Sequence, residues 1–489
     1  MKTREEWERE VKAAEQARGW QGRYRMKYHL MPPVGWLNDP NGLCQFRGVY
    51  HVFFQYDPLY GTDSGKFWGH YTSKDLVSWS YEGLALFPDR QEDRNGVYSG
   101  SAWIRDGEMH LFYTGNVKLK GDYDYIDRGR ESCQLGVTSR DGLRMSEKQK
   151  FLGMEDYPPE YTAHIRDPKI YEKDGCFYMA LGGRKRWEQE GTRLDRGAIL
   201  VYESADLETW KLAGEIESRE RFGYMWECPD LFDLGGRTVV SFSPQGVPGE
   251  ERRFQNVYQS GYGFLSAPFE GRGWGTRTVD GFREWDMGFD FYAPQSFQGE
   301  DGRRLLLAWA SVPDSEKEYG NPTVEEGWIH CLTVPREIRE RNGILCQAPA
   351  GELKTLRRGE FSLPEKEAVK LPSDAVDIEL SAAGNGPFRV TLEDGVSGSA
   401  MVLEAEGTQA RLAFSGNLGA GRKERLAVLD REIEDVRILL DVSIAEIYIN
   451  GGETVFTTRL YPQGERMTLR AEGGEGRGWE MGSYTITEI

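Results

Sequence analysis

Three acidic residues lie in short motifs of the kind that could form a catalytic site. Asp39 lies in a W-L-N-D-P-N-G segment, Asp167 in an R-D-P triplet and Glu227 in an E-C-P triplet. Taken singly, each motif is typical of a turn or of a surface charge beside proline. Crowded carboxylates cannot all ionise cheaply, so grouping them raises at least one pKa and separates a charged nucleophile from a protonated acid. Such pairs cleave glycosidic bonds, with the carboxyl groups about 5–5.5 Å apart for retention and about 6.5–9.5 Å apart for inversion.

A five-fold repeat predicts how these distant residues meet. Segments that begin at residues 42, 100, 166, 228 and 293 share an apolar run, a Gly-containing turn and a second run rich in aromatic and β-branched residues. Glycine supplies the positive φ that hairpin turns need. A second signal agrees, because the segment 73–79 (SKDLVSW) recurs at 204–210 (SADLETW). Short strands repeating at this length predict a five-bladed β-propeller over residues 26–350, with a β-sandwich or solenoid of accidental spacing as the alternative.

The acidic residues fall at nearly the same phase of this repeat. The first strand of each propeller blade lines the central channel, so residues just before each hairpin face the channel mouth. Asp39, Asp167 and Glu227 occupy that phase in three units, and Asp290 lies near it in the fifth. We therefore expect them around one pocket, with Asp290 as a fourth candidate. Asp39 is expected to be the ionised nucleophile and Glu227 the protonated acid. Asp167, held charged beside Arg166, is expected to stabilise the transition state.

The rest of the chain predicts two further regions. Residues 1–25 begin with a charged stretch that predicts a short amphipathic helix, and its lack of an apolar core argues against a signal peptide. After about residue 350 aromatic residues thin out, and alternating apolar segments predict a separate antiparallel sandwich over residues 356–489. The predicted fold class is therefore all-β, a five-bladed β-propeller followed by a C-terminal antiparallel β-sandwich.

Charge and cysteine usage narrow the function classes. The formal net charge of −18 disfavours nucleic acid and anionic membranes as partners, because both are bound by a basic face. No apolar stretch approaches the roughly 20 residues that span a bilayer. The six cysteines include no C-x-x-C pair, so we expect buried free thiols rather than a metal or redox site. These features predict a cytoplasmic enzyme.

The motifs resemble glycoside hydrolase family 32, the β-fructofuranosidases that include invertases and bacterial sucrose-6-phosphate hydrolases. The resemblance runs from about Trp36 to Glu337. It rests on the three acidic motifs, on W-G-H at 68–70, on D-F-Y-A-P-Q at 290–295 and on G-W-I-H-C-L-T-V-P-R-E at 327–337. It implies the same two-domain fold, no metal or organic cofactor, and the roles of nucleophile, stabiliser and acid/base for Asp39, Asp167 and Glu227. It also implies substrate contacts at Asn38, Gln55, Trp68 (as an aromatic wall), Tyr98, Ser99, Arg166 and Trp309.

The resemblance further implies hydrolysis of the fructosyl bond of sucrose or sucrose 6-phosphate through a covalent fructosyl-enzyme intermediate. The expected partner is a small sugar, either of these or a short fructo-oligosaccharide, and the oligomeric state is left open. Fructan exo-hydrolysis and fructosyl transfer are variants of the same chemistry. A non-catalytic sugar-binding propeller and an inverting pentosidase are alternatives of other classes. A phosphate on the substrate needs a basic partner, for which the run Arg184–Arg186 is a candidate, with a solvated charge run as the alternative.

Overall fold

Five antiparallel four-stranded units follow one another along the chain up to Pro349. The computed structural model describes residues 2–60, 65–267, 273–384 and 386–488. Successive strands of each unit are hydrogen-bonded neighbours, and a short turn connects the first two strands of every unit. The strands are β1 (Gly35–Phe46), β2 (Val49–Asp57), β3 (Phe67–Ser73) and β4 (Ser78–Leu86); β5 (Val97–Arg105), β6 (Glu108–Lys118), β7 (Arg130–Ser139) and β8 (Gln149–Leu152); β9 (Tyr161–Lys173), β10 (Cys176–Lys185), β13 (Arg196–Ser204) and β14 (Lys211–Ser218); β15 (Met225–Leu234), β16 (Arg237–Gln245), β17 (Gly261–Leu265) and β18 (Gly275–Glu284); β19 (Tyr292–Gln298), β20 (Arg304–Trp309), β22 (Arg336–Arg341) and β23 (Ile344–Pro349).

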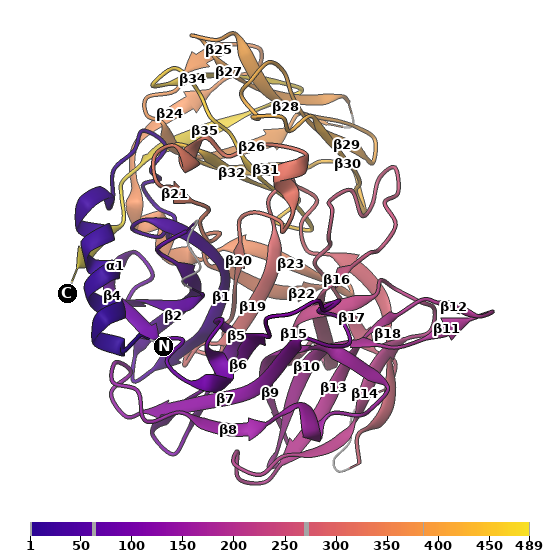
Figure 1. Cartoon of the computed structure of the whole chain (residues 1–489). Coiled ribbons are helices and arrows are strands. Elements are labelled where there is room, and N and C mark those ends of the chain that lie inside the picture. The colour runs from indigo at the N-terminus through magenta and orange to yellow at the C-terminus, as the bar shows by residue number, and fades with distance from the viewer. Residues whose placement is uncertain (1, 61–64, 268–272, 385, 489) are drawn as a thin grey trace.

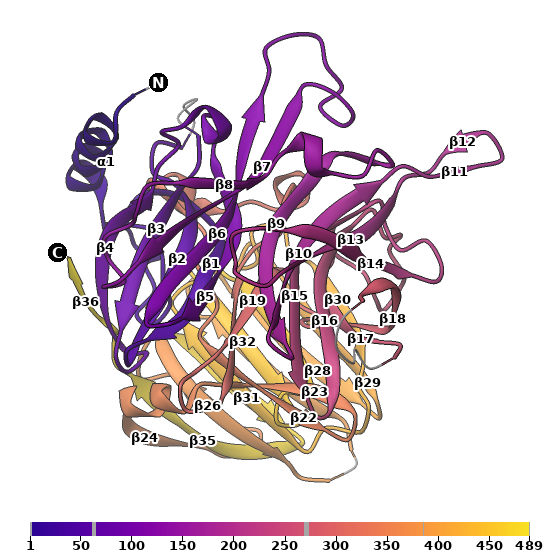
Figure 2. The same ribbon diagram turned by 90° about the horizontal axis from the view of Figure 1, so that it is seen from below.

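Two six-stranded sheets follow the propeller blades and form the sandwich. One sheet has the order β24 (Arg357–Leu363), β35 (Gly474–Met481), β26 (Ala375–Ala382), β31 (Asp435–Asp441), β32 (Ile444–Ile449) and β33 (Thr454–Arg459). The other has the order β25 (Ala368–Lys370), β34 (Met467–Glu472), β27 (Phe388–Asp394), β28 (Ser399–Glu406), β29 (Gln409–Phe414) and β30 (Glu424–Val428). The predicted fold class, a propeller followed by a sandwich, is confirmed. The orange and yellow sandwich lies above the indigo-to-pink propeller in Figure 1 and behind it in Figure 2.

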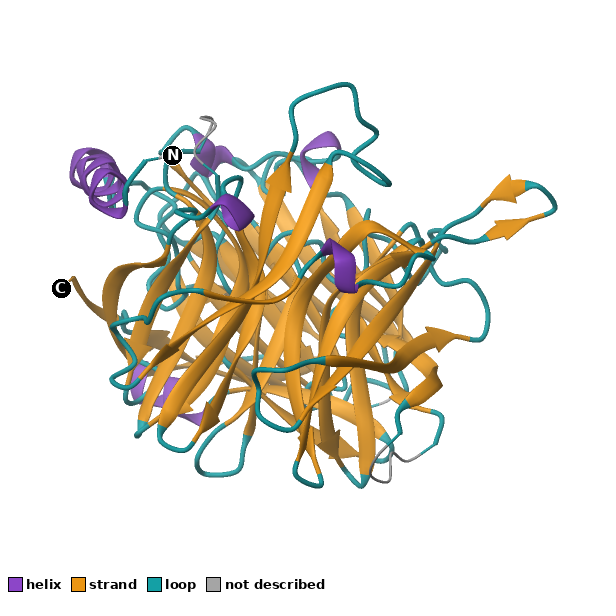
Figure 3. Ribbon diagram, turned by 60° about the horizontal axis from the view of Figure 1, so that its bottom comes forward, coloured by secondary structure: helices purple, strands orange, loops and turns teal. Residues whose placement is uncertain are grey.

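Helix α1 (Arg4–Arg18) lies against the rim of the first blade, beside a molecule otherwise dominated by strands (Figure 3). Its start is fixed by a capping box, in which the Thr3 hydroxyl accepts the Glu6 N–H and the Glu6 carboxylate accepts the Thr3 N–H. The buried Trp7 ring meets Phe67 of β3 edge to face at 5.2 Å. The amphipathic pattern of this segment therefore serves to bury one helical stripe on the propeller.

Two short strands pair with the first blade although they lie far from it in the sequence. β36 (Thr485–Glu488) pairs in parallel with β4 at the outer edge of the first blade, and β21 (Trp328–Ile329) pairs in parallel with β1 at its inner edge. The sequence prediction assigned the whole of residues 356–489 to the sandwich, so the return of β36 to the propeller was not anticipated. A four-residue strand with no periodicity of its own carries no signal for such a distant partner.

The two domains share one apolar core at their contact. Leu37 of β1 and Trp309 of β20 belong to the same buried cluster as Leu439 of β31 and Tyr448 of β32. In the described part of the chain no helix could cross a membrane, no group of three or more acidic, His or Cys side chains could hold a metal ion, and the six cysteines are free thiols. The continuous core means that the sandwich fixes the position of the neighbouring propeller strands.

Candidate active site

A β-bulge interrupts the inner strand of every blade at the same place. In each blade two residues face a single residue of the next strand. The pairs are Asn38 and Asp39 in β1, Tyr98 and Ser99 in β5, Asp167 and Pro168 in β9, Cys228 and Pro229 in β15, and Ala293 and Pro294 in β19. A bulge bends its strand and re-aims the side chains beside it, and proline is tolerated there because the ladder is already interrupted. Each blade therefore brings residues at its bulge, or directly before it, to one place near the axis.

A cavity of about 450 Å³ lies where these bulged strand ends meet. Its size is within the range of about 300–1,000 Å³ that is typical of small-molecule sites. Its lining residues are Trp36, Asn38, Asp39, Gln55, Lys66, Tyr98, Ser99, Arg130, Arg166, Asp167, Glu227, Tyr292, Trp309, Pro313 and Asp314. The three predicted acidic residues, which are far apart in the sequence, therefore line one cavity.

Asp39 is held by two neighbouring blades. Its Oδ2 accepts a hydrogen bond of 2.5 Å from the Ser99 hydroxyl and lies 3.7 Å from the Cys228 Sγ. Burial raises the pKa of Asp39 and the charge of Glu227 adds to this, whereas the Ser99 hydrogen bond lowers it. Ser99 thus favours the ionised form of a carboxyl group whose pKa is raised by burial.

Asp167 lies deepest of the three, with 6% of its surface exposed. It adopts a left-handed φ of 65°, and its N–H is fixed by the Thr114 hydroxyl at 3.0 Å. Its Oδ2 accepts the Cys228 N–H at 3.0 Å, from the bulge of the next blade. Burial raises the pKa of Asp167 to about 7 even though the charge of Arg166 lowers it. Burial thus opposes the charged form of Asp167 and Arg166 favours it, so the predicted permanent charge stays a prediction.

Arg166 pairs with Glu227 instead. Its Nη2 and Nε lie 2.7 and 3.1 Å from the Glu227 Oε1, but its nearest approach to the Asp167 carboxylate is 4.0 Å. The other oxygen of Glu227 accepts hydrogen bonds from the Tyr292 hydroxyl at 2.6 Å and from the Gln245 amide at 2.8 Å. Four donors from three blades thus fix the orientation of Glu227. The sequence could not reveal this partner, because it depends on how neighbouring blades pack.

Most of the predicted substrate contacts also line the cavity. Asn38 donates to the Gln55 amide oxygen and accepts the Trp36 indole N–H at 3.2 Å, so that all three side chains are fixed together. Trp309 lines the cavity although only 3% of its surface is exposed, and its ring centroid lies 6.3 Å from that of Tyr292. Tyr98, Ser99 and Arg166 line the cavity as well.

Two of the predicted residues do not reach it. Trp68 was expected as an aromatic wall, but it is fully buried behind the bulge of β5, where its indole N–H donates to the Tyr98 carbonyl at 3.0 Å. Asp290 is fully buried at the domain contact, and both of its oxygens pair with Arg422 of the sandwich at 2.7 Å. Trp68 is therefore held behind the strand that lines the cavity, and Asp290 is paired with an arginine of the sandwich.

Six lining residues were not singled out as site residues: Trp36, Lys66, Arg130, Tyr292, Pro313 and Asp314. Trp36 and Tyr292 stand inside motifs that were recognised, so their proximity to the acidic residues was a usable signal. Arg130 begins β7 after a long loop and Lys66 precedes β3, where no repeat or spacing marks them.

The basic run Arg184–Arg186 is engaged elsewhere. Arg184 donates to the Asp195 carboxylate at 2.7 Å, Lys185 to Glu215 at 2.8 Å and Arg186 to Asp127 at 2.7 Å. None of the three lines the cavity described above. This run therefore consists of ion-paired surface charges and does not supply a basic partner inside the cavity.

Paired and buried carboxylates at one end of a propeller axis, oriented by donors and flanked by tryptophan rings, define a glycoside hydrolase. The chain matches the family model "Glycosyl hydrolases family 32 N-terminal domain" over residues 29–349 and "Glycosyl hydrolases family 32 C terminal" over residues 397–488. It therefore belongs to glycosyl hydrolase family 32, and the resemblance seen in the sequence is confirmed.

Individual relatives agree with this placement. The chain is 38% identical over 470 residues to sucrose-6-phosphate hydrolase of Bacillus subtilis (strain 168), covering 90% of this chain and 89% of that protein. It is 37% identical to raffinose invertase of Escherichia coli, covering 92% of each chain. Among solved structures, it is similar to sucrose-6-phosphate hydrolase from Lactobacillus gasseri with a TM-score of 0.86 at 29% identity, covering 99% of this chain and 98% of that one.

Proposed function

We propose that this chain is a retaining β-fructofuranosidase that hydrolyses the fructosyl bond of sucrose or sucrose 6-phosphate. The observation that carries the proposal is the convergence of Asp39, Asp167 and Glu227 on one cavity. Each comes from a different blade, and each is held by a donor from a neighbouring strand. The names of the relatives, which act on sucrose 6-phosphate and raffinose, support the same substrate class.

The proposed reaction has two steps. Asp39 attacks the anomeric carbon of the fructosyl unit while Glu227 gives its proton to the departing glycosidic oxygen, which leaves a fructosyl ester on Asp39. Glu227 then takes a proton from water, and the resulting hydroxide cleaves the ester and releases fructose. Asp167 stabilises the positive charge that develops on the sugar ring in both transition states. Tyr292 and Arg166 keep Glu227 aimed at the cavity.

The substrate contacts proposed with this reaction are Asn38, Gln55, Tyr98, Ser99, Arg166 and Trp309, together with the newly found Trp36. Trp36 and Trp309 provide flat apolar faces, with ring centroids 5.9 Å apart, against which a sugar ring can stack. The amides of Asn38 and Gln55 provide donors and acceptors for hydroxyl groups.

The direct test is a product profile of the purified chain on sucrose, sucrose 6-phosphate, raffinose, kestose and inulin. We expect release of fructose from sucrose or its phosphate at least tenfold faster than from inulin. Fast release from inulin would favour the fructan-active alternative, and new oligosaccharides would favour transfer. If no substrate releases fructose, the proposal is wrong and a non-catalytic sugar-binding propeller takes its place.

A phosphorylated leaving group is the form that the charges of the cavity support best. Arg130 lines the cavity, and its guanidinium donates to the Asn116 side chain at 2.7 Å and the Tyr125 carbonyl at 3.4 Å, with no ion pair among the described residues. Lys66 approaches one carboxylate, Asp57, at 3.9 Å. A cation such as Arg130, which has no ion pair among the described residues, favours an anionic ligand group, and Lys66 adds a second positive charge to the same cavity. Arg130 and Lys66 thus take the place of the run Arg184–Arg186 as proposed phosphate partners.

The remaining proposals concern organisation and location. We propose that residues 26–350 form the catalytic propeller, with residues 1–25 as an N-terminal helical segment and residues 356–489 as the sandwich domain, whose last strand β36 returns to the propeller. We also propose a cytoplasmic location. The support is that relatives are named for a phosphorylated sugar, a charged compound that does not cross a membrane unaided.

A further inference from the structure

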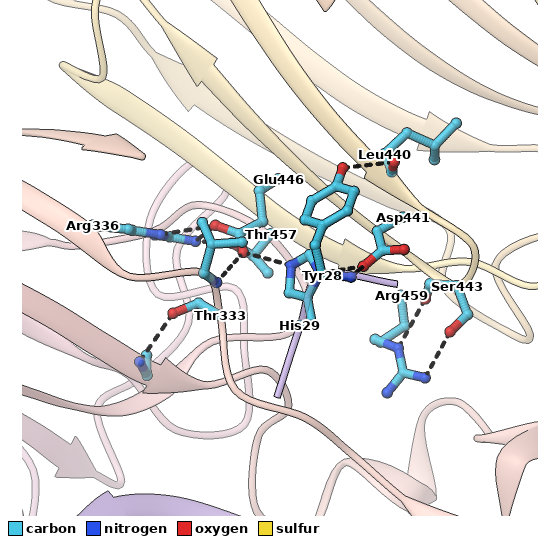
Figure 4. Close-up of polar contacts among 12 residues, drawn as sticks. Tyr28, His29, Thr333, Arg336, Leu440, Asp441, Ser443, Glu446, Thr457 and Arg459 are labelled. Carbon is cyan, nitrogen blue, oxygen red and sulfur yellow. Dashed lines mark hydrogen bonds and ion pairs between the residues drawn. The ribbon is translucent and has the colours of Figure 1, made fainter. Parts of the chain in front are cut away.

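A fully buried network of charges joins the sandwich to the propeller (Figure 4). From the sandwich it contains Asp441 at the end of β31 and Glu446 in β32. From the propeller side it contains His29, which precedes β1, and Arg336, the first residue of β22. The side chains of all four have no exposed surface. We call these four residues the domain joint.

His29 lies between the two sandwich carboxylates. Its Nδ1 is 2.7 Å from the Asp441 Oδ2, and its Nε2 is 3.0 Å from the Glu446 Oε1. An ionised carboxylate only accepts hydrogen bonds, so both ring nitrogens must donate and the ring must be an imidazolium. Burial lowers the pKa of His29, but the two carboxylates outweigh burial and the pKa lies above its ordinary value. Arg336 and Tyr448 both donate to the Glu446 Oε2, and Asp286 pairs with Arg336 at 3.1 Å. The side chains of Tyr28, Cys331 and Tyr484 also interact with the charges of Asp441 and Glu446.

Glu446 connects this charge to the propeller backbone. Its Oε1 also accepts the Val334 N–H at 2.8 Å, and its Oε2 accepts two hydrogen bonds from Arg336 at 2.6 and 2.9 Å. On the other side of His29, the Leu30 carbonyl accepts the Leu332 N–H at 2.9 Å. Glu446 therefore anchors the segment 330–336 at Val334 and Arg336, and Leu30, next to His29, anchors it at Leu332.

That segment packs against Trp36 and Trp309, which line the catalytic cavity and together form what we call the tryptophan wall. His330 has a left-handed φ of 71°, and its ring meets Trp36 edge to face at 4.5 Å and Trp309 at 5.1 Å. Leu332 forms an isolated β-bridge with Trp309. Neither ring nitrogen of His330 has a hydrogen-bond partner among the described residues. His330 is therefore held against the two tryptophans by its anchored backbone and by packing, because its side chain makes no hydrogen bond to the described residues.

We propose that Glu446 and His29 are positioning residues that set the tryptophan wall of the catalytic cavity from the domain interface. The inference rests on the proposed function, since it assigns the wall to sugar binding. Trp36 and Trp309 contact the sugar in the ground state and in the transition state alike, so disturbing them weakens both equally and raises KM. The acidic residues are held by their own bulges and hydrogen bonds within the propeller, so kcat changes little. The sandwich is then part of the substrate-binding machinery.

The imidazolium at the centre gives the joint a pH dependence. When folding raises the pKa of a histidine, its protonated form stabilises the folded state. This stabilisation is complete at a pH below the pKa of the unfolded chain, and it is lost as the pH rises through the pKa of the folded protein. Deprotonated His29 would present a lone pair to one carboxylate at hydrogen-bond distance. We therefore expect KM to rise on the alkaline side, above the ordinary histidine range.

The test is steady-state kinetics with sucrose for the wild type, Glu446→Gln, His29→Gln and a control, Arg283→Gln. The control removes another ion pair across the domain contact, that of Arg283 with Asp430 at 2.5 Å, which has no contact with the wall. For both joint variants we expect KM to rise about two- to thirtyfold while kcat stays within about twofold, as for coupling through a packed network. The control should lower Tm and leave KM unchanged.

The outcomes separate two failures. A wild type that does not hydrolyse sucrose refutes the proposed function, whereas an active wild type whose joint variants lower Tm but keep KM refutes the positioning role. Where the joint variants do not fold, the wild type itself decides, by ¹⁵N NMR of histidine-labelled protein with KM measured over the same pH range. A KM that stays constant through the pH at which His29 loses its proton would overturn the proposal, and a parallel rise supports it.

Discussion

Replacing Arg130 by Gln tests which substrate charge the cavity is built for. The variant keeps a side-chain amide that can still donate to Asn116, and it removes the guanidinium charge. Hydrogen bonds to charged groups contribute about 1.5–3 kcal/mol. At about 1.4 kcal/mol per factor of ten, the loss of one such contact to a phosphate lowers kcat/KM for sucrose 6-phosphate roughly 10- to 150-fold.

Sucrose lacks the phosphate, so its kcat/KM should change much less. The assay measures kcat/KM for both substrates at equal ionic strength, because surface charge effects vary with salt. Arg184→Gln is the matched control, since Arg184 is paired with Asp195 and does not line the cavity. An equal effect of Arg130→Gln on both substrates, or a larger effect of Arg184→Gln on the phosphate, would refute the reasoning.

Three further predictions concern the carboxylates. Asp39→Asn and Glu227→Gln should each lower kcat at least about a hundredfold with unchanged circular dichroism, and near-normal sucrose cleavage would remove the assigned roles. Ser99→Ala removes the hydrogen bond that lowers the pKa of Asp39, so the acid limb of the kcat/KM profile should move to higher pH. The control Ser101→Ala loses a hydrogen bond to the Pro168 carbonyl and should leave the acid limb in place. Burial raises the pKa of Asp167 from 3.8 to about 7, so the folded protein holds this proton more tightly and the contribution to stability falls as the pH rises through that interval. Calorimetry of Asp167→Asn should therefore show a raised Tm at pH 8 and no gain near pH 4, together with lost activity; a Tm that does not depend on pH in this way would contradict the sign.

The parts of the fold that depend on short stretches of sequence were predictable. Gly-containing turns between short runs define hairpins, and their recurrence implies blades, because a blade is a local unit. The phase of Asp39, Asp167 and Glu227 within that repeat predicted their convergence. The prolines at 168, 229 and 294 mark three of the bulges that achieve it, although the bulges themselves become visible only in the strand register.

Features that depend on packing between units were not predictable. Arg166 adjoins Asp167 in the chain, yet it pairs with Glu227 across a blade boundary. Asp290 lies near the same phase of the repeat as the three acidic residues, but it pairs with Arg422 of the sandwich, 132 residues further along the chain. Arg130 shows no pattern at all, because its place in the cavity comes from the path of a loop. Residue type and spacing thus predict which groups can react, and tertiary contacts decide which partner each one has.

The proposed double displacement requires that Asp39 carries the fructosyl unit between the two steps. The most direct measurement is mass spectrometry of peptides from enzyme quenched during turnover of sucrose. We predict an increase by the mass of one fructosyl unit on the peptide that contains Asp39, with β-fructofuranose as the first-formed product by NMR. An adduct on a different peptide, or the α anomer formed first with no adduct, would contradict the double displacement at Asp39.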